Sequence, residues 1–104
     1  MRVCVTGAAG FIGSHVVDAV SSFAEVSGID DLSSGSLDNL DGSSCRLVEG
    51  SILDADALAE ATAGVDAVVH LAARPSVPRS IADPVASHAA NATGTMMVLE
   101  AARA

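Results

Sequence analysis

The chain has 104 residues, half of them apolar and 17 % charged, which is the composition of one small folded domain and not of a disordered tail. A net charge of −8 argues against nucleic acid and anionic membranes as partners, because both need a basic face. The apolar runs are far shorter than a membrane span, and the first residues lack the apolar core of a signal peptide. Two cysteines are too few for a disulfide framework and fit a reducing compartment. Since no targeting signal is visible either, we expect a cytoplasmic protein.

Short apolar runs alternate with stretches of helical spacing along the chain. In chain order we expect a strand at residues 2–6, a helix from Ile12 to Phe23, a strand at 26–29, a loop at 32–45, a strand at 46–49, a helix at 54–63, a strand at 67–73 and a long helix from Pro84 towards Arg103. Asp54 is predicted to cap the second helix. The alternation predicts an α/β fold with parallel strands joined by right-handed crossovers.

A glycine-rich segment joins the first strand to the first helix. Gly7, Gly10 and Gly13 have the spacing G-x-x-G-x-x-G. One glycine allows a tight turn, another lets the backbone approach a pyrophosphate, and a third lets the helix pack against the strand. The free N–H groups and the positive dipole end of the helix can then hold phosphates in spite of the negative net charge. The alternative is a strand-to-helix turn that binds no ligand.

An acidic residue follows the second strand. Asp30 lies 20 residues beyond Gly10, where a carboxylate that accepts hydrogen bonds from a ribose hydroxyl is expected. Such a carboxylate repels a 2′-phosphate, and residues 31–45 contain no arginine to neutralise one. We therefore expect NAD and not NADP as the cofactor. An ordinary acid at the end of a strand is the alternative.

Four motifs in this order resemble the extended short-chain dehydrogenase/reductase family, and within it the NAD-dependent sugar-nucleotide epimerases and dehydratases. They are TGAAGFIGSHVVD, GIDDLSSG, VVHLAARPSVPRSIADP and NATGT. The resemblance implies a Rossmann-type parallel sheet with helices on both faces, of which this chain holds about four strands in the order 3-2-1-4. It also implies that residues 1–104 are the N-terminal part of an NAD-binding domain, without the catalytic and substrate-binding parts.

The resemblance places a set of residues around NAD. They are Gly7, Gly10, Phe11 and Ile12 at the pyrophosphate, Asp30, Asp31, Ser34 and Gly35 at the adenosine ribose, Ser51 and Ile52 at the adenine, Leu71, Ala72 and Ala73 under the nicotinamide, and Asn91 nearby. Ser51 stands where the family has aspartate, so its bond to the adenine amino group lacks a charge and is expected to be weaker. The alternative for Asn91 is a buried amide with a capping or packing role. His70 is expected to pack in the core and not to act as a base.

The chemistry of the family needs side chains that this chain lacks. The resemblance implies a tyrosine whose pKa is lowered by a lysine four residues later, assisted by a serine or threonine on a fifth strand, with hydride transfer to the nicotinamide. The chain has neither tyrosine nor lysine, and its histidines and cysteines show no metal-ligand spacing. We expect the NAD-binding portion of an enzyme that acts on a nucleotide sugar, without turnover by residues 1–104 alone. A stand-alone NAD-binding module and a non-catalytic fragment are the alternatives.

Two apolar surfaces predict self-association. In the order 3-2-1-4 the fourth strand is an edge with Val68, Val69 and Leu71 and no lysine, proline or charge to blunt it. The last helix carries an apolar stripe, which is made by Ala89, Ala92, Met96 and Leu99 and widened by Met97, Val98 and Ala101. The resemblance implies that this helix helps to form a four-helix bundle between two subunits. We therefore expect a homo-oligomer formed through the C-terminal helix.

Overall fold

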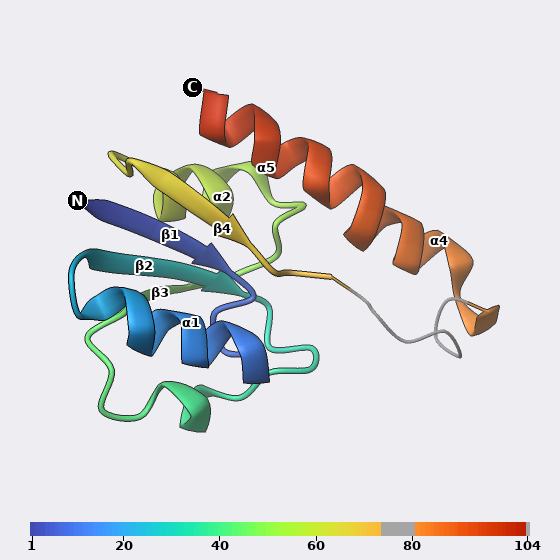
Figure 1. Ribbon diagram of the computed structural model, residues 1–104. Coiled ribbons are helices and arrows are strands. Elements are labelled where there is room, and N and C mark those ends of the chain that lie inside the picture. Colours follow the sequence, from blue (N-terminus) through green and yellow to red (C-terminus); the bar gives the residue numbers. More distant parts are fainter. Residues whose placement is uncertain (74–80, 104) are drawn as a thin grey trace.

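Four parallel strands form the sheet of the computed structural model, which describes residues 1–73 and 81–103. They are β1 (Arg2–Thr6), β2 (Glu25–Asp30), β3 (Arg46–Glu49) and β4 (Ala67–His70). Their order is β3-β2-β1-β4, so the predicted order is confirmed. All strands point the same way in Figure 1, and their carboxyl ends therefore meet along one edge of the sheet. Residues 74–80, in the middle of the third sequence motif, lie outside the described residues.

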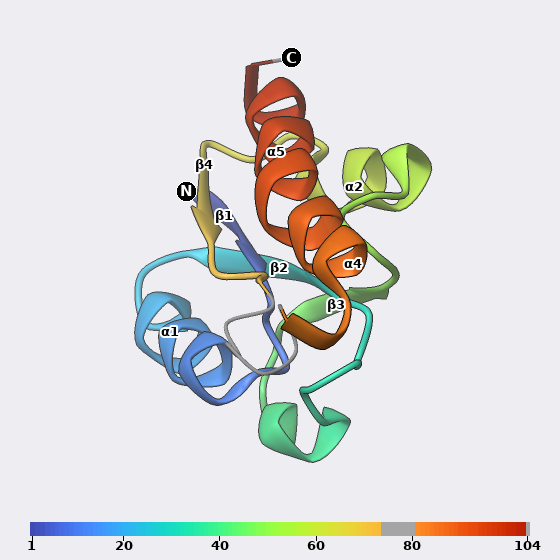
Figure 2. The ribbon, with the colours of Figure 1, turned by 90° about the vertical axis from the view of Figure 1, so that its right-hand side faces the viewer.

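Helices cover both faces of the sheet, as expected. Figure 2 shows α1 (Phe11–Ser21) on one side of the sheet and α2 (Ala55–Thr62) and α5 (Gly94–Arg103) on the other. The first helix ends two residues before Phe23, which is exposed, so the prediction that Phe23 extends the apolar face of this helix is wrong. Asp54 caps α2 as predicted, since its carboxylate accepts the N–H groups of Asp56 and Ala57. No helix in the described ranges is long and apolar enough to cross a bilayer.

The long C-terminal helix is present but not uniform. It consists of α4 (Pro84–His88), a π-helical turn η2 (Ala89–Thr93) and α5. The N–H of Gly94 donates to the carbonyl of Ala89, five residues earlier, which widens this turn. On α5, Val98 is buried while Met96 is 59 % and Leu99 is 65 % exposed.

Two other elements differ from the sequence prediction. β4 ends at His70 and not at residue 73. The N–H of Leu71 is shared between the backbone carbonyl and the hydroxyl of Thr6, and the N–H of Ala72 donates to that hydroxyl alone, so the strand pairing stops here. The predicted loop at 32–45 contains a short 3-10 helix, η1 (Leu37–Leu40), whose first turn is capped by the Ser36 hydroxyl. Serine side chains bond to the backbone two residues on in such turns, so this piece forms without an apolar periodicity.

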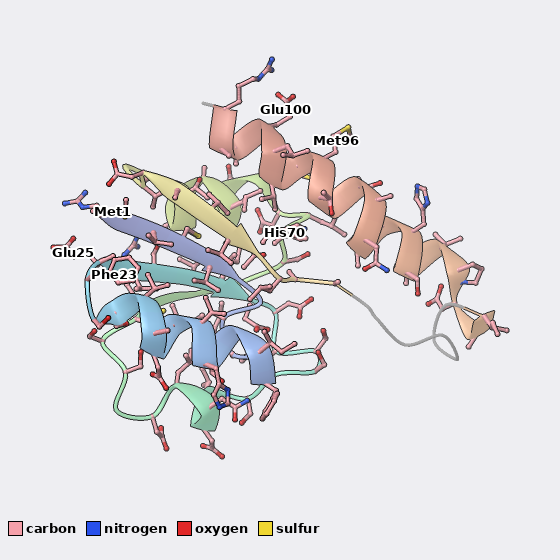
Figure 3. The ribbon with its side chains drawn as sticks, viewed as in Figure 1. Met1, Phe23, Glu25, His70, Met96 and Glu100 are labelled. Atoms are coloured by element: carbon pink, nitrogen blue, oxygen red, sulfur yellow. The ribbon has the colours of Figure 1, made fainter. Side chains whose placement is uncertain are left out.

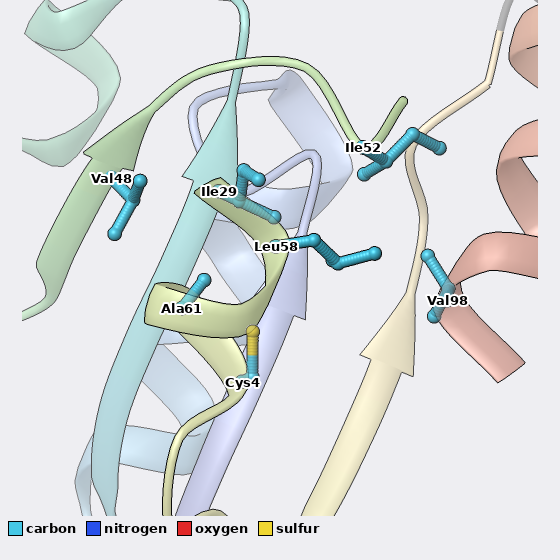
Figure 4. Packing of buried hydrophobic residues seen from close by; sticks show 7 residues of the cluster. All are labelled: Cys4, Ile29, Val48, Ile52, Leu58, Ala61 and Val98. Atoms are coloured by element: carbon cyan, nitrogen blue, oxygen red, sulfur yellow. The ribbon is translucent and has the colours of Figure 1, made fainter. Parts of the chain in front are cut away.

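Small aliphatic side chains form one apolar cluster on each face of the sheet. The cluster under α2 and α5, shown in Figure 4, contains Cys4, Ile29, Val48, Ile52, Leu58, Ala61 and Val98. The cluster under α1 contains Val3, Val5, Ala8, Val17 and Val26. Cys4 is fully buried in the first cluster, as predicted for a small apolar residue. The two clusters fix β1 and β2 between helices, which leaves the loops at their carboxyl ends free to form a site.

Candidate functional site

A cleft of about 290 Å³ opens at the carboxyl edge of the sheet. Its walls come from the segments that follow the four strands and from α4 and η2. The described residues that line it are Gly7, Gly10, Ile29, Asp30, Asp31, Ser33, Ser34, Gly50, Ser51, Ile52, Leu53, Leu71, Ala72, Ala73, Ala86, Ala89 and Ala90. Ligands of open α/β sheets bind at this edge, where the strand order reverses around β1.

The glycine-rich turn is held by close backbone contacts. Gly7 has a φ of +70°, and a Cβ there would lie 3.0 Å from the nitrogen of Ala72. A Cβ on Gly13 would overlap the carbonyl oxygen of Gly7, so α1 can approach the turn only because residue 13 is glycine. These contacts confirm the predicted tight turn, and they show that the glycine at position 13 packs the helix start against this turn, where the sequence predicted packing against the strand.

The N-terminus of α1 is open to an anion. Gly10 is its N-cap and supplies no side-chain hydrogen bond, and the first turn carries no acidic residue. The first N–H groups of the helix therefore keep their hydrogen-bonding capacity and their positive dipole end. Phe11 and Ile12 begin this turn with side chains that are 79 % and 64 % exposed.

The carboxylate of Asp30 connects two loops of the cleft. Its Oδ2 accepts the N–H of Ala9 at 2.9 Å, and its Oδ1 accepts the N–H of Leu32 at 2.7 Å. The residue is only 9 % exposed and lines the cleft. Each oxygen keeps a further lone pair, so the group is positioned by the protein and can still accept bonds from a ligand.

Ser51 and Ile52 form the wall beyond β3. The hydroxyl of Ser51 accepts the N–H of Leu53 at 3.0 Å, and its own proton is left for another acceptor. Ile52 lies in the apolar cluster, and a Cβ on Gly94 would lie 2.5 Å from its Cδ1. The absence of a side chain at Gly94 thus brings the C-terminal helix against this wall.

His70 lies at the end of β4 and is bonded through both ring nitrogens. Nδ1 is 2.7 Å from Thr6 Oγ1, and Nε2 is 3.0 Å from Thr95 Oγ1. Burial lowers the pKa of this imidazole below its ordinary value. The side chain is half-buried and held on both sides by hydroxyl groups, so it is not the buried core residue that the sequence predicts.

Most of the predicted site residues lie in the lining of the cleft. Phe11 and Ile12 lie beside the cleft, at the start of α1. Gly35 packs against the backbone of Ala9, since a Cβ added to Gly35 would lie 2.7 Å from the carbonyl carbon of Ala9. Asn91 lies on η2 and is not part of the lining, although its carbonyl accepts the Thr95 hydroxyl.

Several lining residues were absent from the sequence prediction. They are Ile29, Ser33, Gly50, Leu53, Ala86, Ala89 and Ala90. The first four are chain neighbours of predicted residues. Ala89 and Ala90 follow Ala86 by three and four positions, so the three alanines share one helix face.

Comparison with known proteins decides the family. The model of the family described as NAD dependent epimerase/dehydratase matches residues 3–104. The chain belongs to this family.

Its relatives include a UDP-glucose 4-epimerase of Mycolicibacterium smegmatis, 45 % identical over 99 % of this chain and 35 % of that protein. A dTDP-glucose 4,6-dehydratase of Streptomyces niveus is 43 % identical over 98 % of this chain and 34 % of its own length. The UDP-glucose 4-epimerase of Thermus thermophilus, solved in complex with NAD, superposes with a TM-score of 0.89 at 36 % identity, covering 99 % of this chain and 34 % of that one. The chain thus spans about a third of the length of these members of the family.

Proposed function

We propose that residues 1–104 are the NAD-binding N-terminal part of a sugar-nucleotide epimerase or dehydratase. The observation that carries this proposal is the Asp30 carboxylate, which is fixed by Ala9 and Leu32 in a cleft beside an uncapped helix N-terminus. Family membership and the NAD complex of the Thermus thermophilus relative support it.

Each part of the cleft has its own task in this proposal. The pyrophosphate lies over Gly7 and Gly10 and accepts the N–H groups of Phe11 and Ile12. Asp30 accepts the ribose hydroxyls, flanked by Asp31, Ser34 and Gly35. Ser51 and Ile52 hold the adenine, while Leu71, Ala72 and Ala73 support the nicotinamide half, with Asn91 close by. In the complete enzyme, NAD held by these residues would supply the hydride-transfer chemistry.

The proposal assigns no catalytic residue to this chain. The chain has no tyrosine and no lysine, the pair that the family resemblance implies for proton abstraction, and His70 is held between two hydroxyls. We therefore expect residues 1–104 to bind NAD without converting any UDP- or dTDP-sugar. NAD-dependent conversion by the purified chain would contradict this part of the proposal.

The expected partners follow from the same assignment. A nucleotide sugar is the substrate of the complete enzyme, and a second copy of the chain is the expected protein partner. The negative charge makes nucleic acid and membrane surfaces poor partners. Both cysteines are unpaired, which fits a reducing compartment such as the cytoplasm.

Titration of the chain with NAD and NADP by calorimetry tests the proposal. NAD should bind more tightly, because the 2′-phosphate of NADP would meet the Asp30 carboxylate. Asp30→Asn should weaken the binding of NAD and narrow the difference in affinity between NAD and NADP. It removes the charge at nearly constant shape and also replaces one of the two oxygens that accept the N–H groups of Ala9 and Leu32. Asp38→Asn is the matched control, since Asp38 lies on exposed η1 and its change removes the same charge. Equal or tighter binding of NADP by the unaltered chain would overturn the assignment.

A further inference from the structure

A line of hydrogen bonds runs from the end of β1 to the π-helical turn through His70. Thr6 Oγ1 contacts His70 Nδ1 at 2.7 Å, and His70 Nε2 contacts Thr95 Oγ1 at 3.0 Å. Thr95 Oγ1 lies 2.6 Å from the carbonyl oxygen of Asn91. Figure 3 shows His70 between β4 and the C-terminal helix. The line therefore joins segments on two sides of the cleft.

Donors and acceptors along this line have one consistent order. Thr6 Oγ1 accepts the N–H of Ala72 at 3.1 Å and the N–H of Leu71 at 2.9 Å, the latter shared with the Thr6 carbonyl at 3.2 Å. These two N–H groups occupy the acceptor side of the hydroxyl, so its proton is the one that donates to His70 Nδ1. The imidazole proton then sits on Nε2 and donates to Thr95, whose hydroxyl donates to Asn91. The opposite tautomer would bring a third N–H to the Thr6 oxygen. The contacts thus assign the neutral Nε2–H form.

The wall that this line reaches is made of small side chains. Ala86, Ala89 and Ala90 line the cleft from α4 and η2, and their methyl groups make no directional bond. Gly94, just beyond them, packs against Ile52 through a contact that has no preferred direction. Thr95 adds a directional bond to His70 next to this contact and to the apolar packing of Val98.

We propose that His70 is a positioning residue of the cofactor cleft: as the Nε2–H tautomer it joins Thr6 to Thr95 and holds the helical wall in register with the glycine-rich turn. The inference rests on the NAD site proposed above. Protonation places a new donor against the saturated Thr6 oxygen, breaks the line and loosens the wall, so NAD affinity falls as His70 gains a proton. Burial lowers the pKa of His70 and keeps the neutral form dominant at neutral pH.

Among the described residues of the elements packed against β4, no charged group is bonded to the imidazole. β1 and α5 pack against β4, and they face the ring with the uncharged residues Thr6 and Thr95. The titratable groups of these two elements are bonded elsewhere or buried: Arg2 with Glu25, Arg103 with Glu100, and Cys4 in the apolar cluster. Titration of His70 itself therefore governs how the line responds to pH near neutrality.

The test uses the whole 104-residue chain, labelled with ¹⁵N. Ring nitrogen and amide spectra are recorded without ligand from about pH 8 to about pH 5.5, and NAD is then titrated over the same range. Thr95→Val removes the hydroxyl at constant shape, and Thr95→Ser restores it. Thr62→Val is the matched control, because Thr62 donates to the Leu58 carbonyl at 2.8 Å, the same four-residue bond on α2 without a histidine.

We expect the ring nitrogen spectra to show the Nε2–H tautomer of His70. We also expect the amide resonances of Leu71, Ala72, Ala89 and Ala90 to shift together as His70 titrates. Thr95→Val should shift the alanine amides, weaken NAD binding roughly threefold to tenfold at neutral pH and flatten its pH profile. Thr95→Ser should regain both properties, and Thr62→Val should behave as the unaltered chain.

Two results would overturn the inference. One is an Nδ1–H tautomer, and the other is a Thr95→Val variant whose alanine amides, or whose NAD affinity and pH profile, match those of Thr62→Val. A chain that binds no NAD at all would refute the proposed function instead. The ligand-free tautomer and amide shifts would then decide, without NAD, whether His70 holds the wall.

Discussion

The carboxylate of Asp30 accepts the backbone N–H of Ala9 at 2.9 Å, although the two residues lie 21 positions apart. Ala9 belongs to the glycine-rich turn, and Asp30 ends the neighbouring strand β2. The carboxylate that is proposed to bind the ribose therefore also stabilises the glycine-rich turn, which is proposed to bind the phosphates. Loss of this side chain should damage both parts of the cleft at once.

Asp30→Ala should weaken NAD binding more than tenfold, because about 1.5–3 kcal/mol of charge-assisted hydrogen bonding to the ribose is lost. It should also lower the melting temperature, since the N–H groups of Ala9 and Leu32 lose their acceptor. Calorimetry and thermal unfolding measure the two effects. Asp38→Ala, an exposed aspartate on η1, should change neither; a similar loss in that variant would show that net charge and not the Asp30 geometry is responsible.

Ser51→Asp should tighten NAD binding by roughly twofold to tenfold. A carboxylate there accepts the adenine amino group with a charge, and it can still accept the N–H of Leu53 as the serine does. The affinities of Ser51→Asp and Ser51→Ala for NAD, measured side by side, should move in opposite directions. If both variants bind NAD with equal affinity, the adenine does not contact residue 51.

Gly13→Ala should destabilise the fold by about 1–3 kcal/mol, although alanine is the better helix former. The new methyl group would overlap the carbonyl of Gly7, a backbone group that the turn holds in place. Gly94→Ala is the matched comparison, because its methyl group meets the flexible end of Ile52 at 2.5 Å. Urea unfolding should show a clearly smaller loss for Gly94→Ala, and the reverse ranking would contradict the packing described for the turn.

Stability should fall as the pH drops below about 6.5, in part through His70. Burial holds the pKa of the folded imidazole below its ordinary value of 6.5, so the unfolded chain takes up this proton first. The unfolded state then binds more protons than the folded one, and the free energy of unfolding decreases. Urea unfolding from about pH 7.5 to about pH 5.5 should show a shallower decline for His70→Gln than for the unaltered chain. Parallel curves for the two proteins would mean that His70 contributes nothing to this decline.

The fold was predictable because its signals are local. The glycine spacing, the apolar runs and Asp54 each specify a turn, a strand or a cap from a few neighbouring residues, and the four motifs together imply the strand order. The loop at 32–45 was read as irregular because η1 is stabilised by a serine hydroxyl and not by an apolar pattern. The sequence predicts a longer strand β4 because its apolar run continues past His70. In the structure the pairing stops there, since the N–H of Ala72 donates to the hydroxyl of Thr6, a residue far away in the sequence, and the N–H of Leu71 is shared between this hydroxyl and the Thr6 carbonyl.

The sequence predicts those site residues that belong to a recognisable motif. It predicts less well the residues whose position depends on tertiary packing. Asp30 follows from its distance to the glycine-rich turn, but its bond to Ala9 does not, since it depends on how β1 and β2 align. The alanine wall of α4 and η2 carries no chemical signal. Its place depends on the π-helical turn and on the contact of Gly94 with Ile52, which become visible only in three dimensions.

The chain should self-associate, more strongly as salt rises. β4 is the edge of the sheet in the described residues, and α5 leaves Met96 and Leu99 exposed, with Met96 and Glu100 on the side away from the sheet in Figure 3. The net charge of −8 opposes association, but salt screens exposed charges beyond about 8 Å at physiological strength. Sedimentation at tens of micromolar should therefore show a larger oligomer fraction at high salt than at low salt. Leu99→Asp should shift the chain towards monomer, whereas Leu37→Asp, the same change at an exposed leucine of η1, should not. A monomer under both salt conditions would mean that the edge and the helix face are protected.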